Sequence, residues 1–278
     1  THMMSLGAPL TIVDFFMHPF MVRALVVGTL LSALSGYYGV FVVQRKMSFL
    51  GAGLGHAAFG GIALGLFLGV QPLWVALPFT VLVAIGISWI RRQTLLSSDT
   101  VIGIFFSVSV ALGILLLSLK SGRSVDAFSY LFGSILAIDT LDIAATITLS
   151  AIAIASSLSL WGPWAYATFD PEAAKLEGIH TGRHDMMLTS LIALTIVVAI
   201  KVVGVLLVAA WIVVPAATAR LISTSFRGMT LVSMGVSILA TLVGLMGSWM
   251  LDLPSGALIV LVQILIFVPS VIYQSAKR

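Results

Sequence analysis

The sequence predicts an all-α integral-membrane protein, a polytopic bundle of about eight or nine membrane-spanning helices. Of its 278 residues, 60% are hydrophobic and only 9% are charged, whereas soluble domains carry roughly 25% charged residues. The mean hydropathy of +1.16 is too high for a soluble fold of this length, which has too little interior to bury so much apolar surface. We expect one membrane domain over residues 4–278, preceded by Thr1-His2-Met3, which looks like a cloning remnant.

The spacing of the charged residues predicts nine spans. Five uncharged runs each reach the roughly 20 residues needed to cross hydrocarbon, namely 24–44, 100–119, 143–169, 228–251 and 253–276. The longer run 47–90 holds two spans, with a turn at Val70-Gln71-Pro72. Two shorter runs flank Lys201, so either one span is short or the Lys201 side chain extends toward the membrane surface.

Two segments are too interrupted to count as spans. Residues 4–19 are mildly hydrophobic and contain Pro9 and Pro19, which predicts a lead-in helix at the membrane interface. Lys120, Arg123 and Asp126 predict a short external loop, after which residues 127–138 predict a short amphipathic or re-entrant helix. Neither segment has the composition of a soluble domain, so the prediction of a single membrane domain stands.

Residues 50–69 are the most unusual span because glycine is so frequent there. Its glycines are Gly51, Gly53, Gly55, Gly60, Gly61, Gly65 and Gly69. The last three repeat every four residues and form one flat helix face on which another helix can pack closely. Such a narrow helix is typical of a span that lines a translocation path, and equally of tight packing alone.

His56 lies inside this glycine-rich span, on the same helix face as Ala52 and Gly60. No other histidine lies inside a predicted span. An ionisable group within the membrane is a functional candidate because it is costly to keep there, and neutral imidazole is a common metal ligand. The alternative is a histidine that bonds a neighbouring carbonyl between close-packed helices.

The polar segment 169–178 stands between two long hydrophobic runs and predicts a short helix of about two turns. Asp170 is a suitable N-cap, Pro171 fits the first helical position, and Gly178 favours a left-handed stop. Glu172 adds negative charge in the first turn, where the helix dipole favours it. A helix this short is unstable alone, so it is either a docking element for a soluble partner or an ordinary interfacial helix.

Three further features are weaker candidates for function. Asp252, in the hairpin Leu251–Gly256, either supplies an oxygen ligand to a cation or caps the helix predicted to start at Pro254. Asp139 and Asp142 favour a solvated helix start near the same surface. Pro215 is expected to kink its span, as prolines do where transporters bend or line a pore.

The distribution of basic residues predicts the orientation. If the short helix is cytoplasmic, ten of the 14 basic residues share its side of the membrane, which satisfies the positive-inside rule. These ten are Arg45, Lys46, Arg91, Arg92, Lys175, Arg183, Arg220, Arg227, Lys277 and Arg278. The N-terminus is then outside and the C-terminus inside.

Several function classes are excluded by residues that the sequence lacks. With no cysteine there is no disulfide, thiolate metal site or thiol redox chemistry. The net charge of +4 is too small and dispersed for binding nucleic acid. There is no glycine-rich phosphate-binding loop and no catalytic constellation, so we expect no enzymatic activity, no permanently bound cofactor and, if transport uses ATP, a separate ATPase.

Four segments together resemble the ABC-3 family of metal-ion permeases, the membrane subunits of zinc and manganese importers. They follow the family's order and comprise 45–65, the coupling-helix motif Asp170-Pro171-Glu172-Ala173 with Gly178, the stretch 203–219, and 252–256. The resemblance implies a type II ABC-importer-like permease in the cytoplasmic membrane of a prokaryote. It also implies a homodimer that binds two cytoplasmic ABC ATPase subunits and an extracytoplasmic metal-binding protein.

The resemblance also implies a metal path through the second span. His56 matches the family's path histidine, and Ala52 stands where the family usually carries Asp or Glu. We therefore expect import of Zn²⁺ or Mn²⁺, with His56 and Asp252 along the path. The alternatives are the same machinery carrying another solute such as a metal chelate, or a stand-alone ion-coupled secondary transporter.

Overall fold

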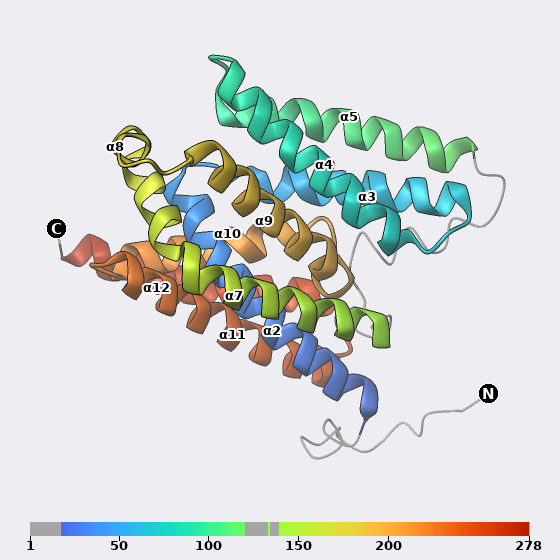
Figure 1. Ribbon diagram of the computed structural model, residues 1–278. Helices are drawn as coiled ribbons and strands as arrows, with labels where there is room; N and C mark the ends of the chain where they lie inside the picture. Colours follow the sequence, from blue (N-terminus) through green and yellow to red (C-terminus); the bar gives the residue numbers. More distant parts are fainter. Residues whose placement is uncertain (1–17, 120–132, 134–138, 278) are drawn as a thin grey trace, which may run out of the picture.

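The computed structural model describes residues 18–119, 133 and 139–277, and the secondary structure of this part is entirely helical (Figure 1). The predicted all-α membrane bundle is confirmed. The helices are α2 (Pro19–Gln44), α3 (Leu50–Leu68), α4 (Pro72–Gln93), α5 (Ser98–Leu119), α7 (Thr140–Phe169), α8 (Pro171–Leu176), α9 (Thr181–Val203), α10 (Val208–Ile222), α11 (Phe226–Leu251) and α12 (Ser255–Ala276). The predicted lead-in helix over 4–19 and the predicted re-entrant helix over 127–138 lie almost wholly outside the described residues.

Eight of the described helices are long and apolar enough to cross a membrane. The ninth predicted span corresponds to α10, which has only 15 residues. The short helix α8 marks one end of the bundle, which we call the α8 end, and α12 finishes there (Figure 1). The opposite end, where α2 begins, we call the far end.

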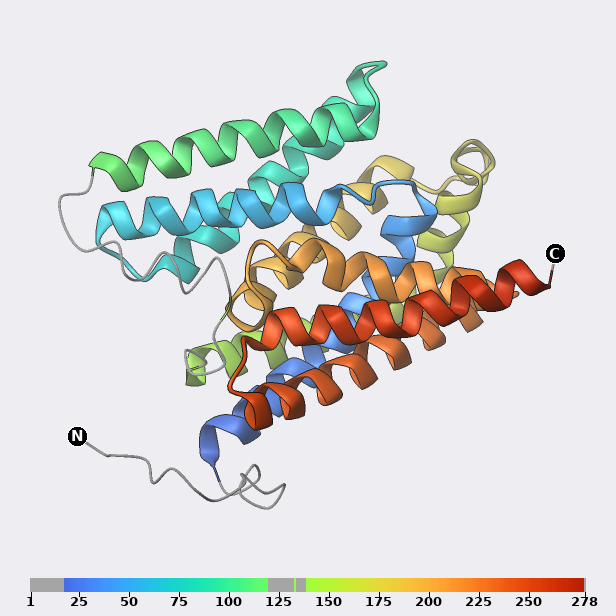
Figure 2. The ribbon, with the colours of Figure 1, turned by 180° about the vertical axis from the view of Figure 1, so that it is seen from behind.

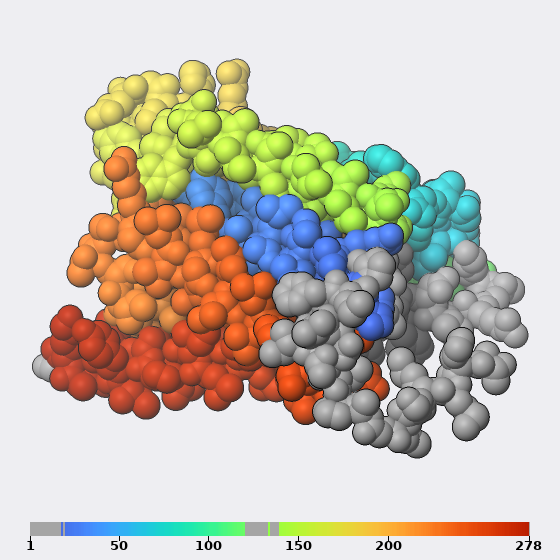
Figure 3. All heavy atoms as spheres, turned by 90° about the horizontal axis from the view of Figure 1, so that it is seen from below, coloured from blue at the N-terminus to red at the C-terminus, as the bar shows by residue number. Residues whose placement is uncertain are grey.

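The helices divide into a packed centre and an apolar periphery. In the most apolar windows of α2, α3 and α9, 78%, 72% and 72% of the residues are buried, against 22% in α5 and 17% in α7. α2 lies between α7 and α11, as Figure 3 shows from below. α3, α4 and α5 form a second group, which is joined to the rest through α9 and α10 (Figure 2).

The structure corrects two expectations about charges at the far end. α9 starts at Thr181 and has 23 residues, so it is not a short span. Lys201 does not extend to the surface, because its Nζ lies 2.8 Å from Asp142 Oδ1 and 3.6 Å from Asp139 Oδ2. The predicted solvated helix start is wrong for Asp142, whose side chain is only 3% exposed. The physical reason is this ion pair, which sequence spacing did not indicate.

Candidate functional site

The glycines of α3 allow three other helices to approach its backbone closely. A Cβ placed on Gly61 would lie 2.7 Å from Ala76 Cα, and one on Gly65 would lie 2.8 Å from Pro72 Cα, both in α4. The predicted flat glycine face is therefore present at Gly61 and Gly65, whereas Gly69 ends the helix with φ of 71° and a Cβ placed on it would meet no described atom within 4 Å.

Two other neighbours use the remaining glycines. Cβ atoms on Gly51 and Gly55 would lie 2.9 Å from Ala209 Cα and from Val208 Cγ1, at the start of α10. A Cβ on Gly60 would lie 2.9 Å from the Ser109 carbonyl oxygen of α5. Within one chain these glycines serve close packing around the segment that carries His56.

The His56 side chain is half-buried between α3 and α5. Its Nδ1 lies 3.0 Å from the Ala52 carbonyl oxygen, and its ring centroid lies 4.4 Å from that of Phe106. The alternative interpretation, a histidine bonded to a neighbouring carbonyl between close-packed helices, differs in one respect, because the carbonyl belongs to α3 itself. Since a carbonyl only accepts, this bond requires a proton on Nδ1; in a neutral imidazole the lone pair is then on Nε2, as in a histidine that ligates metal through Nε2.

Asp252 does not cap α12. It is the exposed C-cap residue of α11, in the left-handed conformation with φ of 52° and ψ of 43°, while α12 begins at Ser255 after Pro254. The structure does not bring Asp252 and His56 together, because α3 packs on α4, α5, α9 and α10 whereas Asp252 lies on a far-end turn. The part of the chain that the structure describes contains no cluster of three or more histidine or acidic side chains suited to a metal.

The break between α9 and α10 adjoins the glycine face of α3. Gly204 has φ of 89°, and Val205 is buried with only 1% of its surface exposed. The Val205 carbonyl oxygen lies 3.4 Å from a Cβ placed on Gly55. Irregular backbone buried within a membrane bundle is tolerated only against protein or a water-filled cavity. Gly204 was the sequence feature that could have indicated this helix break, but we placed the boundary between the two spans at Lys201.

Pro215 lies within α10 and frees one carbonyl for contacts between helices. Proline has no N–H, so the carbonyl four residues earlier, that of Trp211, loses its helical partner. The Ser35 hydroxyl of α2 donates to this oxygen at 3.0 Å, and the Gln263 amide of α12 donates at 3.4 Å. The proline thereby connects three helices at a buried point.

We expect Gln263→Leu to lower the free energy of unfolding by roughly 0.6 kcal/mol, the average for hydrogen bonds between membrane helices, and by no more than about 1.7 kcal/mol. Among the described residues, the substitution leaves the Ser35 hydroxyl as the one donor from another helix to the Trp211 carbonyl. Unfolding in mixed micelles measures the change. Gln274→Leu, near the end of the same helix, is the control; equal stability of the two variants would contradict the role of Gln263.

The short helix α8 has the predicted boundaries and caps. Asp170 accepts a hydrogen bond from the Ala173 N–H at 2.9 Å, Pro171 opens the helix, and Gly178 has φ of 82°. α8 packs on α7 and α9, with Ala174 completely buried. Glu172 is exposed, so its carboxylate points to the surroundings of the bundle rather than into it.

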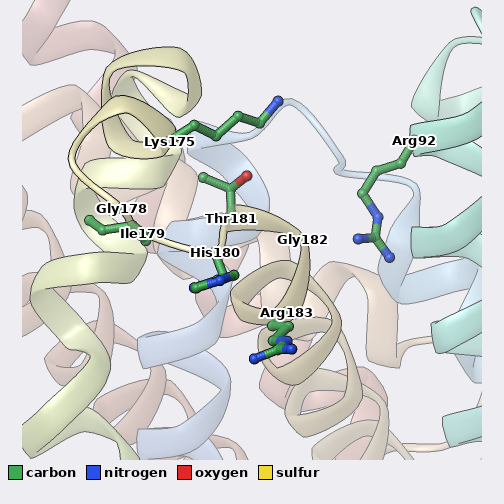
Figure 4. Close-up of a pocket in the computed structure, with 8 residues that line it drawn as sticks. All are labelled: Arg92, Lys175, Gly178, Ile179, His180, Thr181, Gly182 and Arg183. Carbon is green, nitrogen blue, oxygen red and sulfur yellow. The ribbon is translucent and has the colours of Figure 1, made fainter.

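A cationic hollow opens beside α8. It has a volume of about 450 Å³ and is lined by Arg92, Lys175, Gly178, Ile179, His180, Thr181, Gly182 and Arg183 (Figure 4). Three of these side chains carry a positive charge, and none lies within ion-pair distance of an acidic group in the described residues. Leu176, next to the hollow on α8, is 90% exposed. Electrostatic complementarity makes a positively charged surface of this kind attractive to negatively charged groups.

A bundle of long apolar helices with a half-buried histidine, a broken span and an exposed short helix at one end belongs to the class of polytopic membrane transport proteins. The family model described as ABC 3 transport family matches residues 17–274. This chain belongs to that family.

Relatives with defined names support the assignment. The high-affinity zinc uptake system membrane protein ZnuB of Haemophilus influenzae is 36% identical over 89% of this chain and 95% of its own length. The manganese transport system membrane protein MntC of Listeria monocytogenes is 32% identical over 90% of this chain and 89% of its own.

Two solved structures share the fold. A chain of PsaBC from Streptococcus pneumoniae, solved in complex with Fab, is similar with a TM-score of 0.82 and 31% identity, over 94% of this chain and 95% of that one. A transporter described as of the metal-chelate ABC type, in an inward-facing conformation, has a TM-score of 0.72 over 97% of this chain and 91% of its own. At 17% identity, it supports the fold alone.

Proposed function

We propose that this chain is the permease subunit of an ATP-driven importer that moves Zn²⁺ or Mn²⁺ across the cytoplasmic membrane of a prokaryote. The observation that carries the proposal is full-length similarity to membrane proteins named for zinc and manganese transport. Imidazole and carboxylate ligands serve both ions, so the residues present do not select between them. Residues 4–278 act as one transmembrane permease domain.

The permease works as a homodimer with two cytoplasmic ABC ATPase subunits and an extracytoplasmic metal-binding protein. The ATPase binds the α8 end, through Asp170, Pro171, Glu172, Ala173 and Gly178 and through the adjacent cationic hollow. The binding protein delivers metal at the far end. Support comes from the exposure of Glu172 and Leu176 and from the lack of a phosphate-binding loop in this sequence.

Within each chain, His56 faces the metal path and Asp252 attracts the cation at the outer surface. Gly51, Gly55, Gly60, Gly61, Gly65 and Pro215 hold the helices around His56 close together. Two-fold symmetry would double any single ligand, which compensates for the absence of a metal cluster within the described part of one chain.

The second candidate is the same machinery carrying a metal chelate. Ala52 supplies no carboxylate beside His56, and this leaves a weakly charged path for a bare divalent cation. A stand-alone secondary transporter has less support, because the chain belongs to an ABC transport family.

Reconstitution decides between these candidates. The permease is placed in proteoliposomes with its cognate ATPase and binding protein, and uptake of Zn²⁺, Mn²⁺ and their chelates is measured with and without ATP. We expect uptake of at least one free ion that requires ATP. Uptake of chelates alone would favour the second candidate, and uptake without the ATPase would overturn both.

The proposed orientation places the N-terminus outside and the C-terminus inside, and cysteine labelling tests it in a chain without native cysteines. We expect Ser98→Cys and Lys175→Cys to react only from the cytoplasmic side. Ser255 is buried and bonds the Val202 carbonyl, and Ser121 lies outside the described residues, so Leu253→Cys on the exposed far-end turn is the external reporter. Labelling of Lys175→Cys from outside would overturn the orientation and the docking role of α8 together.

A further inference from the structure

One arginine joins both helices that flank α8 to the helix that carries His56. The Arg45 Nη1 donates to Asp185 Oδ1 of α9 at 2.7 Å, and its Nε donates to the Thr168 hydroxyl of α7 at 2.9 Å. The Thr168 hydroxyl in turn donates to the Trp164 carbonyl at 2.6 Å. Only 10% of the Arg45 side chain and 15% of the Asp185 side chain are exposed, so solvent screens this pair weakly.

Arg45 is also firmly connected to α3. It is the C-cap residue of α2, and the next residue, Lys46, is left-handed with φ of 54°. The Lys46 and Met47 N–H groups bond back to carbonyls of α2 at 3.1 and 3.0 Å, and the Leu50 N–H bonds the Met47 carbonyl at 2.8 Å. Met47 is buried. These hydrogen bonds make the turn between Arg45 and the start of α3 rigid, so a movement of Arg45 also moves the start of α3.

The short helix α8 has its main packing contacts with α7 and α9. A displacement of α8 by a bound partner therefore acts on these two helices first. Thr168 is two residues before the Asp170 N-cap of α8, and Asp185 is in the first turn or two of α9. Arg45 thus bonds the two flanks close to the points where they meet α8.

We propose that Arg45 and Asp185 are positioning residues that transmit the movement of α8 to the His56 helix, and so couple ATP hydrolysis to metal movement. The proposal rests on the proposed function. Neither residue contacts the metal or the ATPase in this assignment. A buried, charge-assisted hydrogen bond suits this role because it is strong enough to hold the two helices together as they move. An exposed ion pair would add little binding energy between them.

A second arginine approaches the same carboxylate. Arg91 Nη1, at the end of α4, is buried, has no hydrogen-bond partner among the described residues, and lies 3.8 Å from Asp185 Oδ2. Asp185 therefore faces one tightly bound and one loosely placed guanidinium. Through Arg91 the same carboxylate also reaches α4, the helix packed on Gly61 and Gly65 of α3.

The test measures ATP hydrolysis and metal uptake in the same proteoliposomes for wild type, Arg45→Gln, Asp185→Asn and the double variant. We expect both single variants to assemble with the ATPase and hydrolyse ATP, while metal moved per ATP falls by about tenfold, a typical size of coupling between sites. The double variant should lose no more than either single variant. Arg220→Gln, an exposed arginine at the same end, is the matched control and should retain the wild-type ratio.

Thr168→Val tests the same proposal if Arg45→Gln or Asp185→Asn does not fold. It removes one acceptor of Arg45 without burying a new charge, and we expect roughly a threefold loss in metal moved per ATP. A wild-type ratio in Thr168→Val, additive losses in the double variant, or parallel losses of assembly, hydrolysis and uptake would each overturn the proposal. Failure of wild type to transport metal would instead overturn the proposed function itself.

Discussion

His56→Ala is expected to reduce metal import by roughly tenfold or more while the protein still inserts at normal levels. Losing a residue that only hydrogen-bonds a metal ligand already lowers metal affinity or activity by about tenfold or more, so losing a ligand itself should cost at least as much. The bond from Nδ1 to the Ala52 carbonyl leaves the Nε2 lone pair as the available ligand atom. The other described histidine inside a span-length helix, His184, lies in the first turn or two of α9, at the α8 end. The measurement is the initial rate of Zn²⁺ or Mn²⁺ uptake in proteoliposomes.

His56→Asn is the matched control, because it separates ligation from packing. The asparagine amide nitrogen can occupy the Nδ1 position and donate to the Ala52 carbonyl, but no atom replaces Nε2. If His56 is a ligand, His56→Asn imports as poorly as His56→Ala. Import at the wild-type rate in His56→Asn would show that His56 acts through packing on α3 and α5.

Glu172→Arg is expected to leave the permease inserted and of unchanged oligomeric size, yet to stimulate its ATPase much less than the wild type does. Glu172 is exposed in the first turn of α8, so reversing its charge disturbs no packed core. The proposed contact of the Glu172 carboxylate is a basic group of the ATPase, distinct from the acidic group that the cationic hollow would bind, and like charges placed opposite each other in an interface cost several kcal/mol. We therefore expect ATP hydrolysis by the assembled complex to fall by about tenfold, the equivalent of 1.4 kcal/mol.

Asp99→Arg provides the control for Glu172→Arg. Asp99 is exposed in the first turn of α5, and it undergoes the same charge reversal on a helix that does not pack on α8. It should retain normal stimulation of the ATPase. Normal stimulation by Glu172→Arg as well would remove the docking role of α8, whatever the result for His56.

Much of the architecture follows from the sequence because the bilayer imposes simple one-dimensional rules. Runs of about 20 uncharged residues must be helices, since no water is present to bond a free backbone. The caps of α8 could also be predicted from the sequence, because Asp170, Pro171 and Gly178 act on backbone groups only a few residues away. The four-residue repeat of glycines predicted a flat face on α3, although not which helix would lie on it.

Tertiary structure decided the contacts between residues distant in sequence. The uncharged runs on either side of Lys201 did not indicate that its ammonium group bonds Asp142, 59 positions away in the sequence. The freed Trp211 carbonyl acquires donors from α2 and α12, which no local pattern indicates. Arg45 counted only as a positive charge near the membrane surface until the fold placed it between Thr168 and Asp185. Local backbone chemistry is encoded by neighbouring residues, whereas these pairings depend on how helices cross, because only the crossing brings their side chains within bonding distance.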